Sequence, residues 1–198
     1  MKFLIVGGFL GSGKTSFILG LAKYMLEQRG IHKVVILENE IGEIGIDDKI
    51  LRGSGYQVKG MFSGCVCCTM SGELPSNVLK LQKDLDPDWI IMEATGVAFP
   101  DSIKQNLSEA LGIHAEVVCI ADAQRWERLV KPLAHLLPLQ LEGADLVLLN
   151  KSDLVEKEEL ETARESIRSC NSQTLIECIS TKDGIPAAVF ERIIGWRD

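Results

Sequence analysis

The chain has 198 residues, a formal net charge of −7 and a composition that is 46% hydrophobic and 25% charged. This length fits one domain, and these proportions are typical of a soluble globular protein, so they exclude a disordered chain, a collagen, a coiled coil and a membrane-spanning chain. The acidic balance argues against nucleic-acid binding through a broad basic face. We therefore expect neither nucleic acid nor a membrane as a partner.

Short apolar runs alternate with helical patterns along the chain. A stripe of apolar residues from Ile18 to Leu26 predicts a helix that ends at Gly30, and a second stripe from Leu160 to Cys170 marks one side of a charged helix. The apolar runs predict strands buried on both faces, at 3–6, 34–37, 89–92, 117–120, 146–149 and 175–179. Strand–helix alternation with this spacing predicts an α/β fold, a doubly wound and mainly parallel sheet flanked by helices, in a single domain spanning 1–198.

The first predicted strand leads into a glycine-rich loop, GFLGSGKT at 8–15, which fits the pattern G-x-x-x-x-G-K-[ST] and opens a predicted helix. Glycines let successive backbone N–H groups turn toward phosphate oxygens, and the helix N-terminus adds its positive end. We expect Lys14 to reach the β- and γ-phosphates and the Thr15 hydroxyl to bind Mg²⁺. The chain is therefore predicted to be a P-loop NTPase, with a nucleotide held at Gly8, Gly11, Ser12, Gly13, Lys14, Thr15 and Ser16.

Polar residues after two later strands indicate the rest of a nucleotide site. Asn150, Lys151 and Asp153 follow a buried strand, where a carboxylate can accept hydrogen bonds from the N1–H and 2-amino groups of guanine. Ser180 follows the last predicted strand and is a weaker candidate for closing the same base pocket.

The turn that begins Glu93-Ala94-Thr95-Gly96 follows the strand at 89–92. An acidic residue there can hold Mg²⁺ through water, and Gly96 lets a backbone N–H approach the γ-phosphate. Lys14, Thr15 and Glu93 are thus the predicted catalytic residues, whereas Val97 and Ala98 provide no side chain that could orient the attacking water. We expect slow hydrolysis, which an activating partner or a homodimer across the nucleotide face would speed.

A cluster of cysteines falls in a glycine-rich segment at 53–72. Cys65, Cys67 and Cys68 are spaced so that their thiolates can converge on one ion, and soft sulfur favours Zn²⁺, Co²⁺ or Cu⁺ over Mg²⁺ or Ca²⁺. Redox cycling of adjacent thiols is the competing hypothesis. The remaining cysteines, Cys119, Cys170 and Cys178, are expected to be small buried hydrophobic residues.

Five motifs occur in one order along the chain: GGFLGSGKT, ENEIGEIGID (38–47), GCVCCT (64–69), EATGVAFP (93–100) and NKSD (150–153). In this order they resemble the CobW family of P-loop GTPases, which are implicated in metal delivery. The resemblance implies a GTPase domain, without the C-terminal domain that family members usually carry, whose cysteine loop binds a transition metal such as zinc or cobalt. It also favours Glu38 and Glu43 as additional ligands, with Glu40, Asp47, water or an imidazole as alternatives.

These observations together predict a slow GTPase that uses GTP or GDP, Mg²⁺ and Zn²⁺ or Co²⁺. Its metal loop would respond to the nucleotide state and deliver metal to a client metalloenzyme or cofactor pathway. The alternative is a GTP-dependent switch or activator of a metallocofactor or corrinoid enzyme, in which the cysteines sense metal or redox state. A small-molecule kinase is a weaker third hypothesis. The N-terminus lacks the pattern of a signal peptide, so we expect a cytoplasmic protein with reduced thiols.

Overall fold

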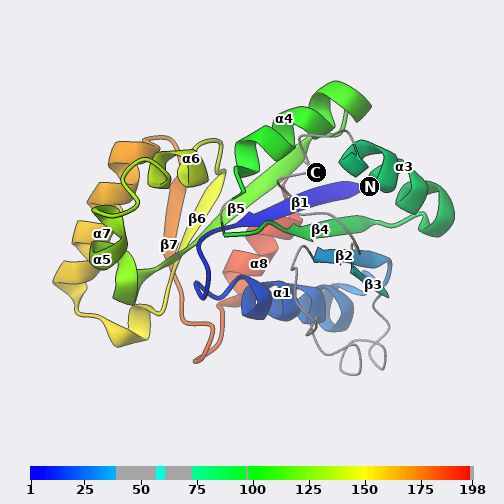
Figure 1. The fold of residues 1–198 in the computed structure, drawn as a ribbon. Helices are drawn as coiled ribbons and strands as arrows, with labels where there is room; N and C mark the ends of the chain where they lie inside the picture. Colours follow the sequence, from blue (N-terminus) through cyan, green and yellow to red (C-terminus); the bar gives the residue numbers. More distant parts are fainter. Residues whose placement is uncertain (39–56, 61–72, 97, 197–198) are drawn as a thin grey trace.

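A seven-stranded parallel sheet forms the centre of the molecule in the computed structural model, which describes residues 1–38, 57–60, 73–96 and 98–196 (Figure 1). The strand order is β3-β2-β4-β1-β5-β6-β7, and each neighbouring pair is parallel. The predicted parallel α/β fold is therefore confirmed. The strands are β1 Lys2–Gly7, β2 Val34–Glu38, β3 Gln57–Gly60, β4 Trp89–Glu93, β5 Ala115–Asp122, β6 Leu146–Asn150 and β7 Leu175–Cys178.

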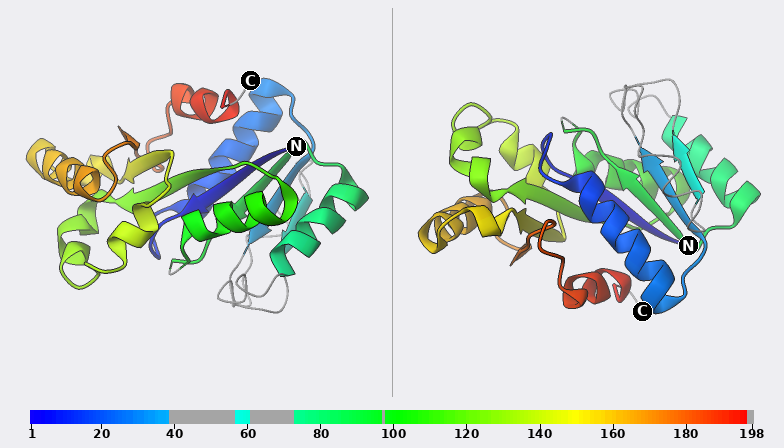
Figure 2. Two further views of the ribbon diagram at one scale, coloured as in Figure 1. Left: turned by 90° about the horizontal axis from the view of Figure 1, so that it is seen from above. Right: turned by 90° about the horizontal axis from the view of Figure 1, so that it is seen from below.

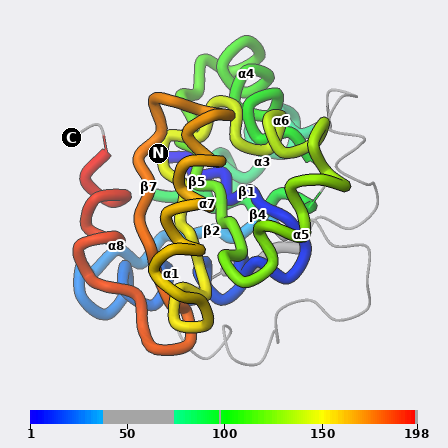
Figure 3. Tube along the Cα trace, turned by 90° about the vertical axis from the view of Figure 1, so that its left-hand side faces the viewer, coloured from blue at the N-terminus to red at the C-terminus, as the bar shows by residue number. Residues whose placement is uncertain are grey.

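Helices cover both faces of this sheet (Figure 2). Helices α1 and α8 lie together on one face, and α3, α4, α6 and α7 lie on the other, an arrangement that Figure 3 shows from the side. No helix within the described ranges has both the length and the apolar character needed to cross a bilayer. The helices are α1 Lys14–Arg29, α3 Glu73–Leu85, α4 Pro100–Leu111, α5 Trp126–Val130, α6 Leu137–Leu141, α7 Lys157–Cys170 and α8 Ala187–Ile194, with short 3₁₀ turns η2 Ala123–Arg125 and η3 Ser152–Leu154.

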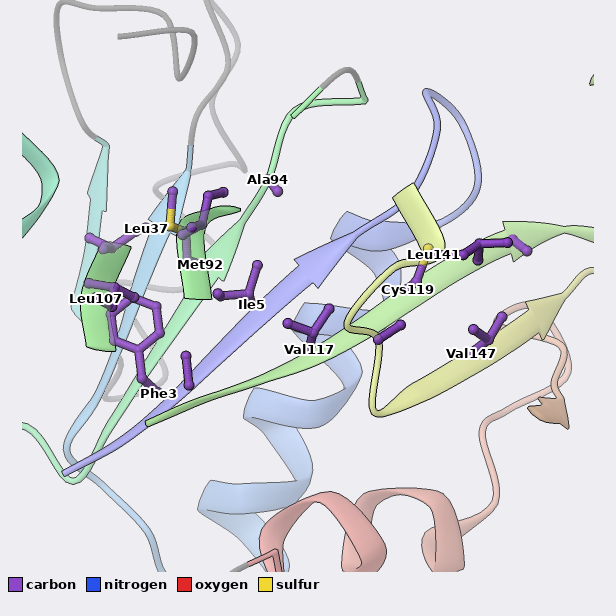
Figure 4. Packing of buried hydrophobic residues seen from close by; sticks show 14 of the residues in the cluster. Phe3, Ile5, Leu37, Met92, Ala94, Leu107, Val117, Cys119, Leu141 and Val147 are labelled. Atoms are coloured by element: carbon purple, nitrogen blue, oxygen red, sulfur yellow. The ribbon is translucent and has the colours of Figure 1, made fainter. Parts of the chain in front are cut away.

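Strand β1 shows why the predicted strands are apolar throughout. Its side chains alternate between the two faces, so Phe3 and Ile5 join the cluster under α4 (Figure 4), whereas Leu4 and Val6 pack against α1. Because helices cover both faces, every one of these positions is buried. The carboxyl ends of the strands are then the places where polar loop residues can gather.

The two predicted helical stripes are confirmed. In α1 the residues Ile18, Leu21 and Met25 are fully buried, and the helix ends at Gly30, whose left-handed backbone lets its N–H bind the Met25 carbonyl. Helix α7 buries Ala163 and Ile167 on its apolar side. Its N-terminus is stabilised by a capping box in which Glu156 and Glu159 bind each other's backbone N–H groups.

Strand β3 was not predicted. It is four residues long, lies at the edge of the sheet and pairs with β2 alone in the described chain. Its sequence, QVKG, has no apolar alternation and ends in a glycine, and another glycine, at position 55, stands shortly before it. A short strand of this composition forms because β2 offers an adjacent hydrogen-bonding edge, which a local pattern does not report.

Candidate nucleotide-binding site

The glycine-rich loop connects β1 to α1 and is closely packed against its neighbours. At Gly8, with φ 126°, an added Cβ would lie 2.2 Å from the backbone oxygen of Ile120 in β5. At Gly13, with φ 104°, it would lie 2.3 Å from Nδ2 of Asn150. Only glycine fits either position. Because Gly13 caps α1 and has no side chain, the first N–H groups of that helix are available to an anion.

Three predicted catalytic side chains meet beside this loop. The Thr15 hydroxyl donates to both carboxylate oxygens of Glu93, at 3.1 Å each. Nζ of Lys14 lies 3.9 Å from Oε1 of Glu93 and donates to the Phe9 carbonyl at 3.3 Å. Hydroxyl and carboxylate oxygens are the hard donors that Mg²⁺ prefers, so Thr15 and Glu93 fit that ion chemically.

Gly96, in the turn after β4, lies against the same loop. A Cβ at this position would lie 2.9 Å from the backbone nitrogen of Leu10, so any side chain would separate the turn from the loop. The register of β1 and β4 explains this approach, because Val6 pairs with Glu93 and both strands end at the same edge. The two segments predicted to surround the terminal phosphate are therefore adjacent.

Asn150 ties the loop to the other side of the site. Its side chain is fully buried, and its Nδ2 donates to the Ser12 carbonyl at 2.7 Å and to Oγ1 of Thr181 at 3.2 Å. Its Oδ1 accepts from the backbone N–H of Thr181 at 3.0 Å. In the structure this amide joins the loop after β6 to the phosphate loop and to the loop after β7.

The other predicted nucleotide-binding residues lie around the same edge of the sheet. Ser16, from the phosphate loop, is exposed at the start of α1. Of the predicted base-binding residues, Asp153 is exposed in the turn η3 and Lys151 has a left-handed backbone with φ 63°. Oγ of Ser180 accepts from the backbone N–H of Asp183 at 3.1 Å and thereby shapes the loop after β7. The residues predicted to bind phosphate and those predicted to bind the base thus lie at one edge of the sheet.

Two buried polar residues at this edge were not predicted. Asp122 ends β5 and binds Lys151 and Arg125, and Gln140 of α6 joins two segments of the site. Oε1 of Gln140 accepts from the Gly8 N–H at 3.3 Å, while its Nε2 donates to the Ala98 carbonyl. An acidic residue at the end of an apolar strand was a usable signal for Asp122, whereas a glutamine within the apolar run LPLQL gave none.

The ionisation of Asp122 is set by opposing effects. Burial by itself would raise the pKa of the Asp122 carboxyl, but hydrogen bonds from Lys151 and Arg125, with their charges, outweigh it and lower that pKa below its usual range. The side chain is 1% exposed and remains a carboxylate because both cations contact it. A buried charge of this kind persists only with such partners.

The predicted transition-metal ligands lie largely outside the described residues. These are Cys65, Cys67, Cys68 and Glu43, with the alternatives Glu40 and Asp47; of Glu38 the backbone is described, at the end of β2. Within the described ranges, no group of three or more His, Cys, Asp or Glu side chains is arranged to hold a metal ion.

The remaining cysteines were expected to be buried. Cys119 is, and burial raises the pKa of its thiol to about 12. Cys170 and Cys178 are only half-buried, and Sγ of Cys178 accepts a hydrogen bond from Arg164 at 3.2 Å. The prediction therefore holds for Cys119 and is wrong in degree for the other two.

A glycine loop between a strand and a helix, a lysine within it and a hydroxyl–carboxylate pair beside it define a P-loop nucleotide-binding domain. Residues 2–177 match the family described as CobW/HypB/UreG, nucleotide-binding domain. The chain belongs to this family, as the resemblance implied.

Curated relatives and solved structures agree with this assignment. The chain is 29% identical to the zinc chaperone CobW of Sinorhizobium sp over 94% of its own length and 60% of that protein. It is 30% identical to the zinc-regulated GTPase metalloprotein activator 1 of Schizosaccharomyces pombe over 84% of its own length and 43% of that protein. The chain therefore spans about half the length of such relatives. The crystal structure of Zn(II)-bound YjiA GTPase from E. coli shares the fold, with a TM-score of 0.66, 21% identity and coverage of 99% of this chain and 62% of that one.

Proposed function

We propose that this domain binds GTP with Mg²⁺, hydrolyses it slowly to GDP and phosphate, and carries a transition-metal ion as cargo. One observation supports the nucleotide part most strongly. The phosphate loop contacts the Glu93–Gly96 turn on one side and the Asn150 loop on the other, so residues suited to phosphate, Mg²⁺ and guanine share one edge.

The roles follow from the chemistry of each group. Backbone N–H groups of Gly11, Gly13 and Ser16 bind phosphate oxygens, and Lys14 neutralises charge at the β- and γ-phosphates. Gly8 and Ser12 shape the loop around the phosphates, because their own N–H groups bind Gln140 and the Phe9 carbonyl. Thr15 and Glu93 would hold Mg²⁺, which would supply charge stabilisation during phosphoryl transfer. Gly96 offers its N–H to the γ-phosphate.

Guanine selection comes from the loop after β6. The exposed carboxylate of Asp153 accepts from N1–H and the 2-amino group, which adenine lacks, and the Lys151 stem lies beside the base. Ser180 shapes the opposite side of the pocket through its contact with the backbone of Asp183.

The metal part of the proposal depends on the donor set in the sequence. Cys65, Cys67 and Cys68 supply thiolates, and Glu38 and Glu43 are the carboxylate candidates, a set suited to Zn²⁺ or Co²⁺. The relatives named as zinc chaperones favour zinc. We propose that GTP draws the 38–47 segment and the Glu93–Gly96 turn toward its γ-phosphate, and that hydrolysis releases the ion to a client metalloprotein.

A titration with Co²⁺ in the presence of GTP tests this assignment. We expect a thiolate-to-metal charge-transfer absorption in the wild type and in the matched control Cys170→Ala, whose cysteine lies in α7. The Cys67→Ala/Cys68→Ala variant should lose that absorption. An unchanged spectrum in this double variant would refute the cysteine site.

A second function is favoured by the relative named a zinc-regulated GTPase metalloprotein activator. In that case the protein would gate assembly of a client enzyme in the cytoplasm, and the cysteines would sense metal or redox state. Transfer of one metal ion per protein to an apo-enzyme supports delivery, whereas activation without transfer supports the sensor. A homodimer across the nucleotide face is compatible with either function.

A further inference from the structure

Asp122 occupies a central place at the nucleotide edge of the sheet. It is the last residue of β5 and pairs in register with Asn150, the last residue of β6. Its Oδ2 accepts from Nζ of Lys151 at 2.6 Å and from Nε of Arg125 at 2.7 Å, and its Oδ1 accepts from the backbone N–H of Arg125 at 3.2 Å. One buried carboxylate therefore binds the side chains of Lys151 and Arg125 and also caps the turn that begins after β5.

Each of these cations belongs to a different part of the nucleotide site. Lys151 lies in the loop proposed to bind guanine, with a left-handed backbone that residues other than glycine rarely adopt. Arg125 reaches the phosphate loop, where its Nη2 donates to the Leu10 carbonyl at 2.6 Å. The same nitrogen lies 2.9 Å from the position of a Cβ on Gly11.

We infer that Asp122 and Arg125 are positioning residues for the nucleotide, which connect the base-binding loop to the phosphate loop through one continuous set of charge-assisted hydrogen bonds. The connection runs from Lys151 through Asp122 and Arg125 to Leu10. This inference rests on the proposed guanine-nucleotide function and adds residues to that site. Asn150 makes a second, separate connection through Ser12, so the two loops are joined at two points.

Removing Asp122 and removing Arg125 should affect nucleotide binding differently. Without the Asp122 charge, Lys151 loses the partner that sets the position of its stem, so preference for guanine should fall together with affinity. Without the Arg125 side chain, the Leu10 carbonyl loses its donor while Lys151 keeps Asp122, so affinity should fall with base preference intact. Arg125→Lys should not restore affinity, because one ammonium cannot reproduce the fork that binds Asp122 and Leu10 at once.

Fluorescence titrations and dissociation rates of GDP and IDP test these expectations on folded protein. IDP lacks the 2-amino group, so the ratio of the two dissociation constants reports the base end, which a loss of general stability would not change. We expect Asp122→Asn to weaken GDP binding by about tenfold or more and to reduce the GDP-over-IDP preference, as expected when one partner of a buried charge pair is removed. Arg125→Ala should weaken both nucleotides equally.

The matched control is Glu177→Gln in β7, which removes the carboxylate of another Arg–carboxylate pair, Glu177 with Arg192 at 2.7 Å. It should leave both constants unchanged. Because Arg125 is partly exposed, its variants provide a test even where Asp122→Asn is too unstable. Two results would overturn this inference without affecting the proposed function. One is an Asp122→Asn variant whose GDP affinity and base preference both stay within twofold of wild type. The other is an Arg125→Ala variant whose GDP affinity stays within twofold of wild type. A wild type with no preference for GDP over ADP would overturn the proposed function as well.

Discussion

Replacing Asn150 by alanine tests how the loops of the nucleotide site are held together. The change removes the partner of two backbone groups, the Ser12 carbonyl and the Thr181 N–H. Each unpaired buried group costs about 1–3 kcal/mol, so we expect a loss of about 3 kcal/mol in the free energy of unfolding. For a domain of this size that corresponds to a fall in melting temperature of roughly 6–12 °C.

Asn171→Ala separates this effect from a general loss of stability. Asn171 also donates from its side chain to two carbonyls, of Leu141 at 2.8 Å and Ala144 at 3.2 Å, but it follows α7 and touches none of the nucleotide loops in the described contacts. Calorimetry should show both variants destabilised. A fluorescence titration with GDP, well below either melting temperature, should show affinity reduced about tenfold or more in Asn150→Ala alone, the fold-change expected for about 1.4 kcal/mol. Equal GDP affinities in the two variants would refute the reasoning.

Three further predictions concern single groups at the site. Glu93→Gln keeps the shape of the side chain and removes its charge, so the Mg²⁺ concentration for half-maximal GTP hydrolysis should rise about tenfold or more; an unchanged Mg²⁺ dependence would contradict the assignment. Gln140→Leu leaves the Gly8 N–H and the Ala98 carbonyl without their partner, so urea denaturation should show a loss of about 2–4 kcal/mol, and wild-type stability would count against the bridge. Because folding lowers the pKa of Asp122, its carboxylate contributes to the free energy of unfolding at pH values above the unfolded pKa of about 3.9. This contribution is lost as pH falls through the folded pKa. The stability difference between wild type and Asp122→Asn should therefore shrink on acidification below about pH 4, and a difference that grows there would show the opposite linkage.

Much of this site could be predicted because its chemistry follows strand ends. The glycine loop, Glu93 and Asn150 each come directly after an apolar run, and parallel strands bring their carboxyl ends to one edge. The types of these residues also restrict their partners, since a loop with a lysine and a threonine in this spacing suits phosphate and Mg²⁺. The residues predicted to bind phosphate and those predicted to bind the base were thus selected independently, and the structure brings both groups to one edge of the sheet.

The contacts that join these segments could not be predicted. Gly8 and Gln140 are 132 residues apart, and nothing in the run around Gln140 indicates that its amide lies between two loops. The burial of Asn150 between Ser12 and Thr181 depends on how three loops pack, which no local pattern encodes. Long-range packing sets these contacts, whereas spacing alone sets the motifs.

Coupling between nucleotide binding and metal binding is the central feature of the proposed function. Calorimetric titration of Zn²⁺ into the protein loaded with a non-hydrolysable GTP analogue, and separately with GDP, measures that coupling. We predict Zn²⁺ binding tighter with the analogue by about fivefold or more, with the same factor gained in analogue affinity when Zn²⁺ is bound. Equal Zn²⁺ affinity in the two nucleotide states would contradict the account.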